Sequence, residues 1–305
     1  MSLLVIGNTV VDIIITQVPR LPTWPRHSEF TPANLVLLPN EPLVTLGGNG
    51  ANAAYVAAYG GARVHLQTNI GEDPLGDVAR GWLRAAGCQL LPSRKVQHTA
   101  INVTAANKRH ARATFFYPGL EPTLPSLRGV PEDTTHVLVC GWPHPPFPQL
   151  EIWFRSLQGE GRFTAMDTGP FLGRPWTLAK LKPLFPSLSL LLTNEYEMTT
   201  IMRNKNLPAC LRKLRQRFDG HVIIKQGSKG ALWLPASSDK PRVIKAPQVR
   251  AVNTVGAGDS FNGALLAALT LGKDFPRAVK QAARAASAIV ASSRGVLGAS
   301  ESGIF

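Results

Sequence analysis

The sequence predicts an α/β fold in which a mostly parallel central sheet is flanked by helices. Beyond Gly119, apolar segments alternate with helical ones at the spacing of right-handed strand–helix–strand units. The expected strands lie at 136–140, 162–167 and 188–193, with a helix at 148–158. Each strand is apolar enough to be covered on both faces, as in a parallel sheet. Ligands bind at the carboxyl ends of such strands. These ends carry Asp167, Asn194, Glu197 and the segment 225–230.

Length and composition indicate one globular domain. The chain has 305 residues, 44% of them hydrophobic and 17% charged, and we expect residues 1–305 to form a single domain. No apolar run reaches the ~18 residues needed to span a membrane. The first residues lack the basic region and cleavage site of a signal peptide. We therefore expect a cytoplasmic protein without a membrane partner.

The net charge of +14, from 33 Lys and Arg against 19 Asp and Glu, raises nucleic-acid binding as a hypothesis. The basic residues are scattered, however, and the densest group, within 203–217, is interpreted as a solvated helix face. We expect no nucleic-acid partner. The three cysteines, Cys88, Cys140 and Cys210, lack CxxC spacing. They indicate a reducing compartment and buried apolar positions, not disulfides or zinc.

The N-terminal segment 3–15 is rich in Val and Ile and predicts one buried strand. Asp12 within it needs a partner or a cavity, because burying an unpaired carboxylate is costly. It either binds a ligand or bonds to the backbone. Repeated prolines between 16 and 46 exclude a helix there. Trp24 and Phe30 in that stretch either contact a ligand or pack.

The next segments predict a Gly-rich turn followed by a helix of small residues at 47–60, a strand at 63–69 and an amphipathic helix at 77–86. Glycines in the turn let the backbone approach a ligand closely. Asn52 in the helix offers both a donor and an acceptor, which suits a hydroxyl group. Its alternative role is to cap the helix.

A β-hairpin is predicted by two extended runs, 99–105 and 111–117, on either side of a polar turn. The residues expected to face a ligand are Ile101, Asn102, Phe115 and Tyr117. Arg109 and Arg112 either meet an anionic ligand or keep the hairpin tip soluble.

The segment 253–261, Asn-Thr-Val-Gly-Ala-Gly-Asp-Ser-Phe, leads directly into a helix rich in Ala and Leu. The free N–H groups of Gly256, Ala257 and Gly258 would point out of the helix start, where the macrodipole favours an anion and no side chain obstructs it. Asp259 in the first turn is placed to accept a proton from an attacking hydroxyl. This combination suits phosphoryl transfer. The alternative is an ordinary Gly-rich helix start with an acidic residue favoured by the dipole.

Two motifs resemble those of the ribokinase-like, or phosphofructokinase B-type, carbohydrate kinases. Residues 253–261 resemble the family's Asp-Thr-x-Gly-Ala-Gly-Asp signature, and residues 47–54, Gly-Gly-Asn-Gly-Ala-Asn-Ala-Ala, resemble its Gly-Gly-x-x-x-Asn-x-Ala substrate motif. The resemblance implies a three-layer fold with a small β-sheet lid formed by about 16–46 and 97–118. It also implies an ATP-dependent kinase that phosphorylates a primary hydroxyl of a sugar or sugar derivative.

The resemblance further implies roles for individual residues. Asp259 is the general base, and Gly256, Ala257 and Gly258 form the anion hole. Substrate binding falls to Asp12, Gly48, Asn52 and Asn102. Asn194 and Glu197 resemble the Asn-x-x-Glu motif, which binds Mg²⁺ through water, although the same pair also suits a helix cap. ATP contacts are implied for Asn194, Lys225, Gly227, Gly230 and Gly258.

The chain departs from the family pattern at two of these positions. Lys225 stands where Thr is common, and its ammonium is expected to reach the ATP phosphates. Asn253 stands where Asp is usual in a site for K⁺ that includes Val255. Because an amide lacks a negative charge, we expect K⁺ to bind weakly or not at all.

Two other functions remain open from the sequence. A nucleoside kinase would use the same core, and a sugar or nucleotide sensor would keep the fold without catalysis. Family analogy also predicts a possible homodimer through the lid.

Overall fold

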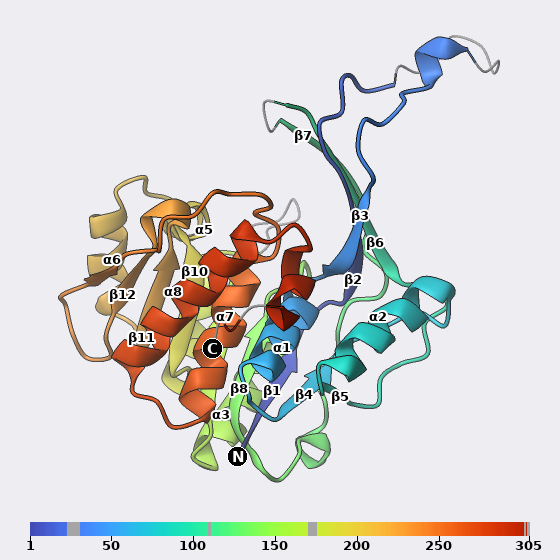
Figure 1. The fold of residues 1–305 in the computed structure, drawn as a ribbon. Helices are drawn as coiled ribbons and strands as arrows, with labels where there is room; N and C mark the ends of the chain where they lie inside the picture. The colour runs from blue at the N-terminus through green and yellow to red at the C-terminus, as the bar shows by residue number, and fades with distance from the viewer. Residues whose placement is uncertain (23–30, 109–110, 170–175, 302, 304–305) are drawn as a thin grey trace.

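The computed structural model describes residues 1–22, 31–108, 111–169, 176–301 and 303, which form two separate sheets (Figure 1). The larger sheet has nine strands within these residues, in the order β13-β12-β11-β10-β9-β8-β1-β4-β5. Its strands are β1 (Ser2–Ile6), β4 (Val64–Gln67), β5 (Gln89–Leu90), β8 (Thr134–Cys140), β9 (Phe163–Asp167), β10 (Leu190–Asn194), β11 (His221–Lys225), β12 (Ala231–Leu234) and β13 (Arg242–Ile244). The strands from β11 to β5 pair in parallel, and β12 pairs antiparallel with both of its neighbours. The predicted mostly parallel sheet is confirmed.

The small sheet rises from one side of this body (Figure 1) and has the order β3-β2-β6-β7. Its strands are β2 (Val10–Ile15), β3 (Leu43–Gly47), β6 (Ala100–Ala106) and β7 (Arg112–Tyr117). The prediction of one strand over 3–15 is wrong. The chain leaves the large sheet after Ile6 and enters the small sheet at Val10, so β2 lies outside the lid boundary expected at about residue 16. The predicted hairpin corresponds to β6 and β7.

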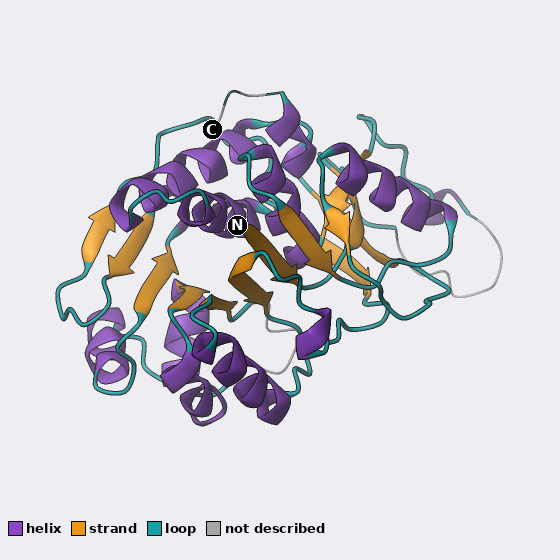
Figure 2. Cartoon of the chain, turned by 90° about the horizontal axis from the view of Figure 1, so that it is seen from below, coloured by secondary structure: helices purple, strands orange, loops and turns teal. Residues whose placement is uncertain are grey.

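Helices cover both faces of the large sheet (Figure 2). One hydrophobic cluster joins that sheet to α1, α2, α7 and α8, and a second joins its other face to α3, α4, α5 and α6. The helices are α1 (Asn49–Tyr59), α2 (Pro74–Ala85), α3 (Phe147–Gly159), α4 (Leu178–Leu181), α5 (Glu195–Met202), α6 (Leu207–Arg215), α7 (Ala257–Thr270) and α8 (Phe275–Ala291). No helix among the described residues is long and apolar enough to cross a membrane.

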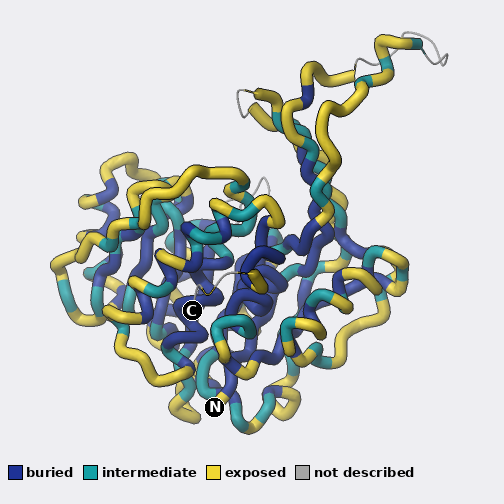
Figure 3. Tube along the Cα trace, viewed as in Figure 1, coloured by how far each residue is buried: buried dark blue, intermediate teal, exposed yellow. Residues whose placement is uncertain are grey.

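Burial follows from this layering. All five residues of β1 are buried, and consecutive residues contribute to opposite clusters: Leu3 and Val5 to one, Leu4 and Ile6 to the other. Figure 3 shows the buried segments in the body, whereas the small sheet becomes exposed toward its tip. The cysteines Cys88, Cys140 and Cys210 are buried free thiols, as predicted.

Small residues allow α1 and α7 to pack against each other at short range. A Cβ on Gly263 of α7 would lie 2.2 Å from the carbonyl oxygen of Ala53 in α1, and one on Gly50 would lie 2.6 Å from the backbone of Gly7. Backbone atoms cannot move aside as a flexible side chain can. The Gly263 contact fixes the position of α7, whose first turn carries Asp259, against α1.

We predict that Gly263→Ala lowers the free energy of unfolding by about 1–3 kcal/mol, because the added methyl overpacks this contact. Gly81, also inside a helix, is the matched control, since a Cβ there would meet no atom within 4 Å. Gly81→Ala should instead stabilise the protein by about 0.5–1 kcal/mol. Urea unfolding followed by circular dichroism measures both, and equal effects would contradict the packing argument.

Candidate active site

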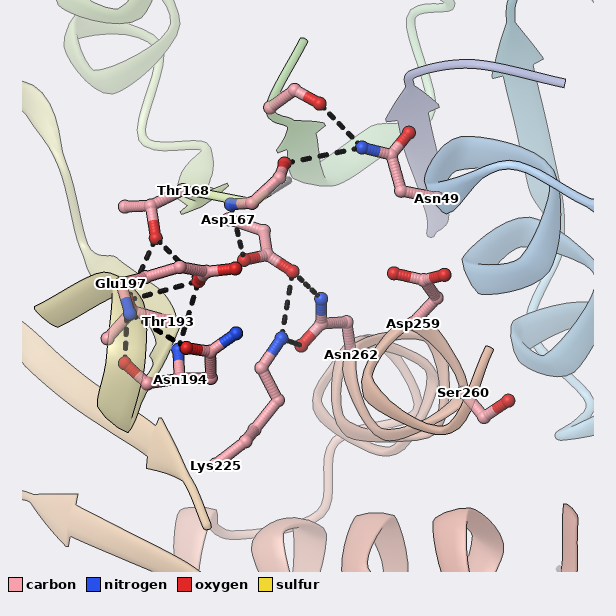
Figure 4. A network of polar contacts seen from close by, with 12 residues as sticks. Asn49, Asp167, Thr168, Thr193, Asn194, Glu197, Lys225, Asp259, Ser260 and Asn262 are labelled. Atoms are coloured by element: carbon pink, nitrogen blue, oxygen red, sulfur yellow. Dashed lines mark hydrogen bonds and ion pairs between the residues drawn. The ribbon is translucent and has the colours of Figure 1, made fainter. Parts of the chain in front are cut away.

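Polar side chains meet where three neighbouring strands end. Asp167 ends β9, Asn194 ends β10 and Lys225 ends β11, and the strand register pairs Asn194 with Lys225 and Leu192 with Asp167. Because these strands are parallel, their carboxyl ends lie at the same edge of the sheet. Figure 4 shows the three side chains at this edge, beside the start of α7.

Lys225 and Asp167 form a buried ion pair at the centre of the group (Figure 4). Lys225 Nζ lies 2.9 Å from Asp167 Oδ2, and the two side chains are 15% and 6% exposed. Lys225 Nζ also donates to Asn262 Oδ1 at 3.2 Å, while the Asn262 amide donates to Asp167 Oδ2. Burial lowers the pKa of Lys225, but the nearby carboxylates, Asp167 foremost, outweigh it and raise the pKa overall. Lys225 is therefore held as a cation.

Glu197 lies next to this pair and helps to cap the N-terminus of α5. Its Oε2 accepts hydrogen bonds from Thr168 Oγ1, Thr193 Oγ1 and Asn194 N at 3.0, 3.2 and 3.0 Å. Asn194 Oδ1 in turn accepts from Glu197 N at 2.8 Å, so the two residues form a capping box. Burial first, and the charge of Asp167 second, raise the pKa of Glu197. The Oε1 atom faces Gly169, where a Cβ would approach it to 2.3 Å.

Asp259 lies in the first turn of α7, one residue after the segment Gly256–Gly258. Gly256 caps this helix with a φ of 77°, a left-handed conformation that favours glycine. A Cβ on Gly256 would also lie 2.7 Å from Val296 Cγ2 and 3.0 Å from Asn52 Nδ2. The backbone here thus excludes any larger side chain.

The carboxyl of Asp259 is held by Asn52, whose Nδ2 donates to Asp259 Oδ2 at 3.1 Å. Burial raises the pKa of Asp259 to about 6, although the charge of Lys225 opposes the shift. Asn52 is 2% exposed, and its Oδ1 is buried without a hydrogen-bond partner among the described residues. An unpartnered acceptor beside this carboxylate suits a ligand that carries a hydroxyl or amine donor.

Asp12 projects from β2 of the small sheet into the same region. Asn102 Nδ2, on the paired strand β6, donates to Asp12 Oδ1 at 3.0 Å. Asp12 is 3% exposed, and burial raises its pKa to about 6. Gly47 leaves the room for it, since a Cβ there would lie 2.3 Å from Asp12 Oδ2.

Two cavities meet at Lys225. The polar cavity, about 500 Å³, is lined by Asp12, Asn52, Asn102, Phe116, Glu197 and Asp259, among others. The apolar cavity, about 300 Å³, is lined by Pro247, Val249, Phe261, Ala283, Ala286 and Val290, among others. Lys225, Gly227 and Gly258 line both. Asp259 faces the polar cavity at this junction.

A profile of the pfkB family carbohydrate kinases matches residues 2–301. The chain belongs to this family. The carbohydrate kinase predicted from the two motifs is thereby confirmed.

Known members of the pfkB family resemble the chain along most of its length. The ribokinase of Bacillus subtilis is 24% identical over 298 residues, covering 95% of this chain and 93% of that protein. The Arabidopsis thaliana ribokinase complexed with ribose and ATP has a TM-score of 0.77 at 21% identity, covering 97% of this chain and 94% of that one. The adenosine kinase of Sinorhizobium meliloti has a TM-score of 0.77 at 18% identity, covering 98% of each chain. These structures confirm the ribokinase-like fold.

The polar cavity brings together most of the residues that the pfkB motifs single out. Its lining includes all four residues predicted to bind the substrate: Asp12, Gly48, Asn52 and Asn102. It also includes residues predicted to act in catalysis or to bind ATP or a metal: Asn194, Glu197, Lys225, Gly227, Val255, Gly256, Gly258 and Asp259. Gly230 and Ala257 line the apolar cavity instead. Gly230 has a φ of 97°, and a Cβ there would lie 2.0 Å from Ile244 O, so this turn also requires glycine.

Three hairpin residues expected to face a ligand, Ile101, Phe115 and Tyr117, lie away from the polar cavity. Asn102 pairs with Phe116, and Phe116 and Thr114 line the polar cavity. Because side chains alternate along a strand, Ile101, Phe115 and Tyr117 lie on the opposite face of the small sheet. Arg112 does not line the polar cavity and donates to Thr254 Oγ1 instead. The suggested ligand contacts of Trp24, Phe30 and Arg109 lie outside the described residues.

Asn253 and Val255 do not fit a monovalent cation. Asn253 Oδ1 accepts from Val255 N at 3.0 Å, so one lone pair of its only side-chain oxygen is used, and this oxygen carries no negative charge. Asn253 Nδ2 is buried without an acceptor among the described residues. A buried N–H donor does not ligate a cation.

The motifs did not assign roles to four residues of the site: Asp167, Asn262, Thr114 and Phe116. The position of Asp167 at a strand end was visible in the sequence, but its partner was not. Asn262 was detectable as a polar residue within an apolar helix, three positions after Asp259. Thr114 and Phe116 depend on hairpin register, which the sequence leaves open by one residue.

We predict that Asp12→Asn stabilises the protein at pH 8 by roughly 1–3 kcal/mol, because burial has raised the Asp12 pKa to about 6. With a folded pKa above the unfolded one, ionised Asp12 destabilises the fold at high pH. This cost decreases as the pH falls from 6 to 4 and is absent below both pKa values. Unfolding of both proteins at pH 8 and at pH 4 measures the difference, which should largely disappear at pH 4. A difference that does not change with pH would contradict the assignment.

Proposed function

We propose that this pfkB family member transfers the terminal phosphoryl group of ATP to a primary hydroxyl of an uncharged sugar or sugar derivative. The observation that carries the proposal is Asp259, a carboxyl with a pKa of about 6 beside the bare backbone of Gly256–Gly258, where the two cavities meet. A group with such a pKa is ionised at neutral pH and is still basic enough to accept a proton.

In this reaction Asp259 removes the proton from the acceptor hydroxyl as its oxygen attacks phosphorus. Asn52 holds one carboxylate oxygen through its Nδ2, which leaves the other oxygen for the substrate. The amides of Gly256, Ala257 and Gly258 stabilise the charge that develops on the transferred group. Asp12 and Asn102 bind further hydroxyls, and Gly48 contributes to the wall of the same cavity.

ATP fits the apolar cavity and the junction. The apolar lining suits an adenine ring, while Gly227, Gly230, Gly258 and the Lys225 ammonium suit its phosphates. Four carboxylates line the polar cavity against one lysine, so an anionic triphosphate needs an added cation there. Glu197 Oε1 and Asn194 provide oxygen atoms for a hydrated Mg²⁺, which would neutralise phosphate charge when bound.

The charged side chains of the polar cavity also favour an uncharged acceptor. Among the described residues that line the polar cavity, the one cation is Lys225, which Asp167 and Asn262 already engage. A carboxylate or phosphate on the acceptor would therefore face Asp12 and Asp259 without compensation. Hydroxyl groups, in contrast, match the amides and carboxylates of the lining.

A nucleoside is the second candidate acceptor. The ring of Phe116 lines the polar cavity, which gives a base a surface on which to stack. The similarity to an adenosine kinase also supports this acceptor. A sensor without catalysis has less support, because the arrangement around Asp259 suits proton transfer.

A substrate panel tests the proposal. Ribose, fructose, adenosine and cytidine are compared with ribose 5-phosphate, fructose 6-phosphate and gluconate, with ADP release as the readout. We expect the protein to phosphorylate at least one uncharged compound. No charged compound should reach a comparable kcat/KM. Binding of an uncharged compound without ADP release would instead identify a sensor.

The role of Asp259 is tested with the preferred acceptor. Asp259→Asn should lower kcat by about 10²- to 10⁴-fold, the usual contribution of a general base. For the unmodified protein, kcat/KM should fall about tenfold per pH unit below the Asp259 pKa of about 6, because only ionised Asp259 accepts the proton. An unchanged kcat in the variant would remove Asp259 from the mechanism.

We further propose that the outer face of the small sheet binds a second copy of the chain. Strand register aligns Val44, Ile13, Val103 and Phe115 in one apolar row across all four strands, opposite the face that carries Asp12. Val44 is 44% and Phe115 66% exposed. Light scattering should give a dimer for the unmodified protein and a monomer for Val44→Asp. A monomeric unmodified protein would contradict this.

A further inference from the structure

The loop of residues 252–256, here called the pre-helix loop, leads into the proposed anion hole and is anchored on one side by α8. The backbone N–H groups of Val252 and Asn253 donate to the carbonyl oxygen of Val290 at 2.9 and 3.1 Å. Within the loop, Val255 N donates to Asn253 Oδ1 at 3.0 Å. The side of the loop that faces the small sheet needs a separate support.

Arg112 supplies that support from the small sheet. Its Nη2 donates to Thr254 Oγ1 at 2.8 Å, across a sequence separation of 142 residues. Arg112 begins β7, the strand whose Thr114 and Phe116 line the polar cavity. Thr254 lines the apolar cavity and lies two residues before Gly256. One guanidinium therefore connects the wall of the polar cavity to the loop beside the apolar one.

The surroundings of this contact disfavour a free cation. A cavity of about 230 Å³ between the small sheet and the pre-helix loop is lined by Glu41, Arg112, Asn253, Val255 and Ser293, among others. The orientation of the Asn253 amide is fixed, because only its oxygen can accept from Val255 N. Its Nδ2 is consequently an unpartnered donor. Glu41 is the one carboxylate of this lining, and it is exposed. A cation in this cavity would meet the Asn253 Nδ2 donor and the positive charge of Arg112, and the exposed Glu41 carboxylate is screened by solvent.

We propose that Arg112 positions the pre-helix loop from the small sheet and thereby removes any need for a free monovalent cation. This inference rests on the proposed kinase function. The Arg112 contact holds Thr254, and with it the backbone amides of Gly256–Gly258. The small sheet and the proposed anion hole are thus linked through one side chain.

The first test compares ions. The unmodified protein is compared in KCl, NaCl and tetramethylammonium chloride at equal ionic strength. Its kcat and its KM for ATP should agree within about twofold among the three salts, and its melting temperature should agree within experimental error. Asn253→Asp replaces the unpartnered Nδ2 with an oxygen, and K⁺ should raise the melting temperature of that variant. Stimulation of the unmodified protein by K⁺, or an Asn253→Asp variant indifferent to K⁺, would overturn the inference.

The second test removes the contact. Arg112→Met and Thr254→Val should each lower kcat/KM for ATP by roughly threefold to tenfold, the size expected for one hydrogen bond. The double variant should be no worse than the single ones, because both changes remove the same bond. Arg155→Met is the matched control. Arg155 is an exposed arginine whose partner is Glu151 on α3, and its loss should leave the kinetics unchanged.

Chemical rescue separates positioning from folding. Millimolar guanidinium chloride should restore activity to Arg112→Met and leave Thr254→Val unaffected. Additive losses in the double variant, or no rescue, would overturn the role of Arg112. The proposed function fails in a different way, because then the unmodified protein releases no ADP with any acceptor.

Discussion

Lys225 carries the positive charge that lets several carboxylates share one poorly hydrated corner of the large sheet. Asp167 and Glu197 are buried close enough to Lys225 to interact with its charge, and Asp259 lies where the two cavities meet beside it. Without the ammonium, the charge of Asp167 would raise the pKa values of Glu197 and Asp259 unopposed. With it, the pKa of Asp259 stays near 6 instead of rising further. The ion pair of Lys225 with Asp167 thus keeps both a fixed cation and an ionisable base in one place.

Space is the second constraint, and glycines provide it. A Cβ on Gly47 would lie 2.3 Å from Asp12 Oδ2, and a Cβ on Gly169 would lie 2.3 Å from Glu197 Oε1. A methyl group at either position would displace the acid from the cavity. The start of α7 needs glycine for a different reason, since Gly256 adopts a positive φ and also packs against Asn52. Glycine therefore makes room for the acids, allows the start of α7 and permits the close contact between helices.

The sequence predicted the parallel sheet because strands covered on both faces are apolar throughout, as β1 and β10 are. It predicted the start of α7 because a turn of bare amides has a local signature. It failed at 3–15, where two strands of different sheets follow one another and share the same Val- and Ile-rich composition. It also failed for the face of the hairpin, because a shift of one residue exchanges Phe115 and Phe116 without altering the pattern.

The sequence by itself determined the family, the α/β fold, the Gly-rich start of α7 and the identity of its neighbouring acid, because these depend on residues adjacent in the chain. Tertiary structure decided which groups act on them. Asn52 lies 207 residues from Asp259, Asp167 lies 58 from Lys225, and Arg112 lies 142 from Thr254. Hydrogen bonds and charges act over a few ångströms of space, and distance along the chain does not reveal which side chains will be that close.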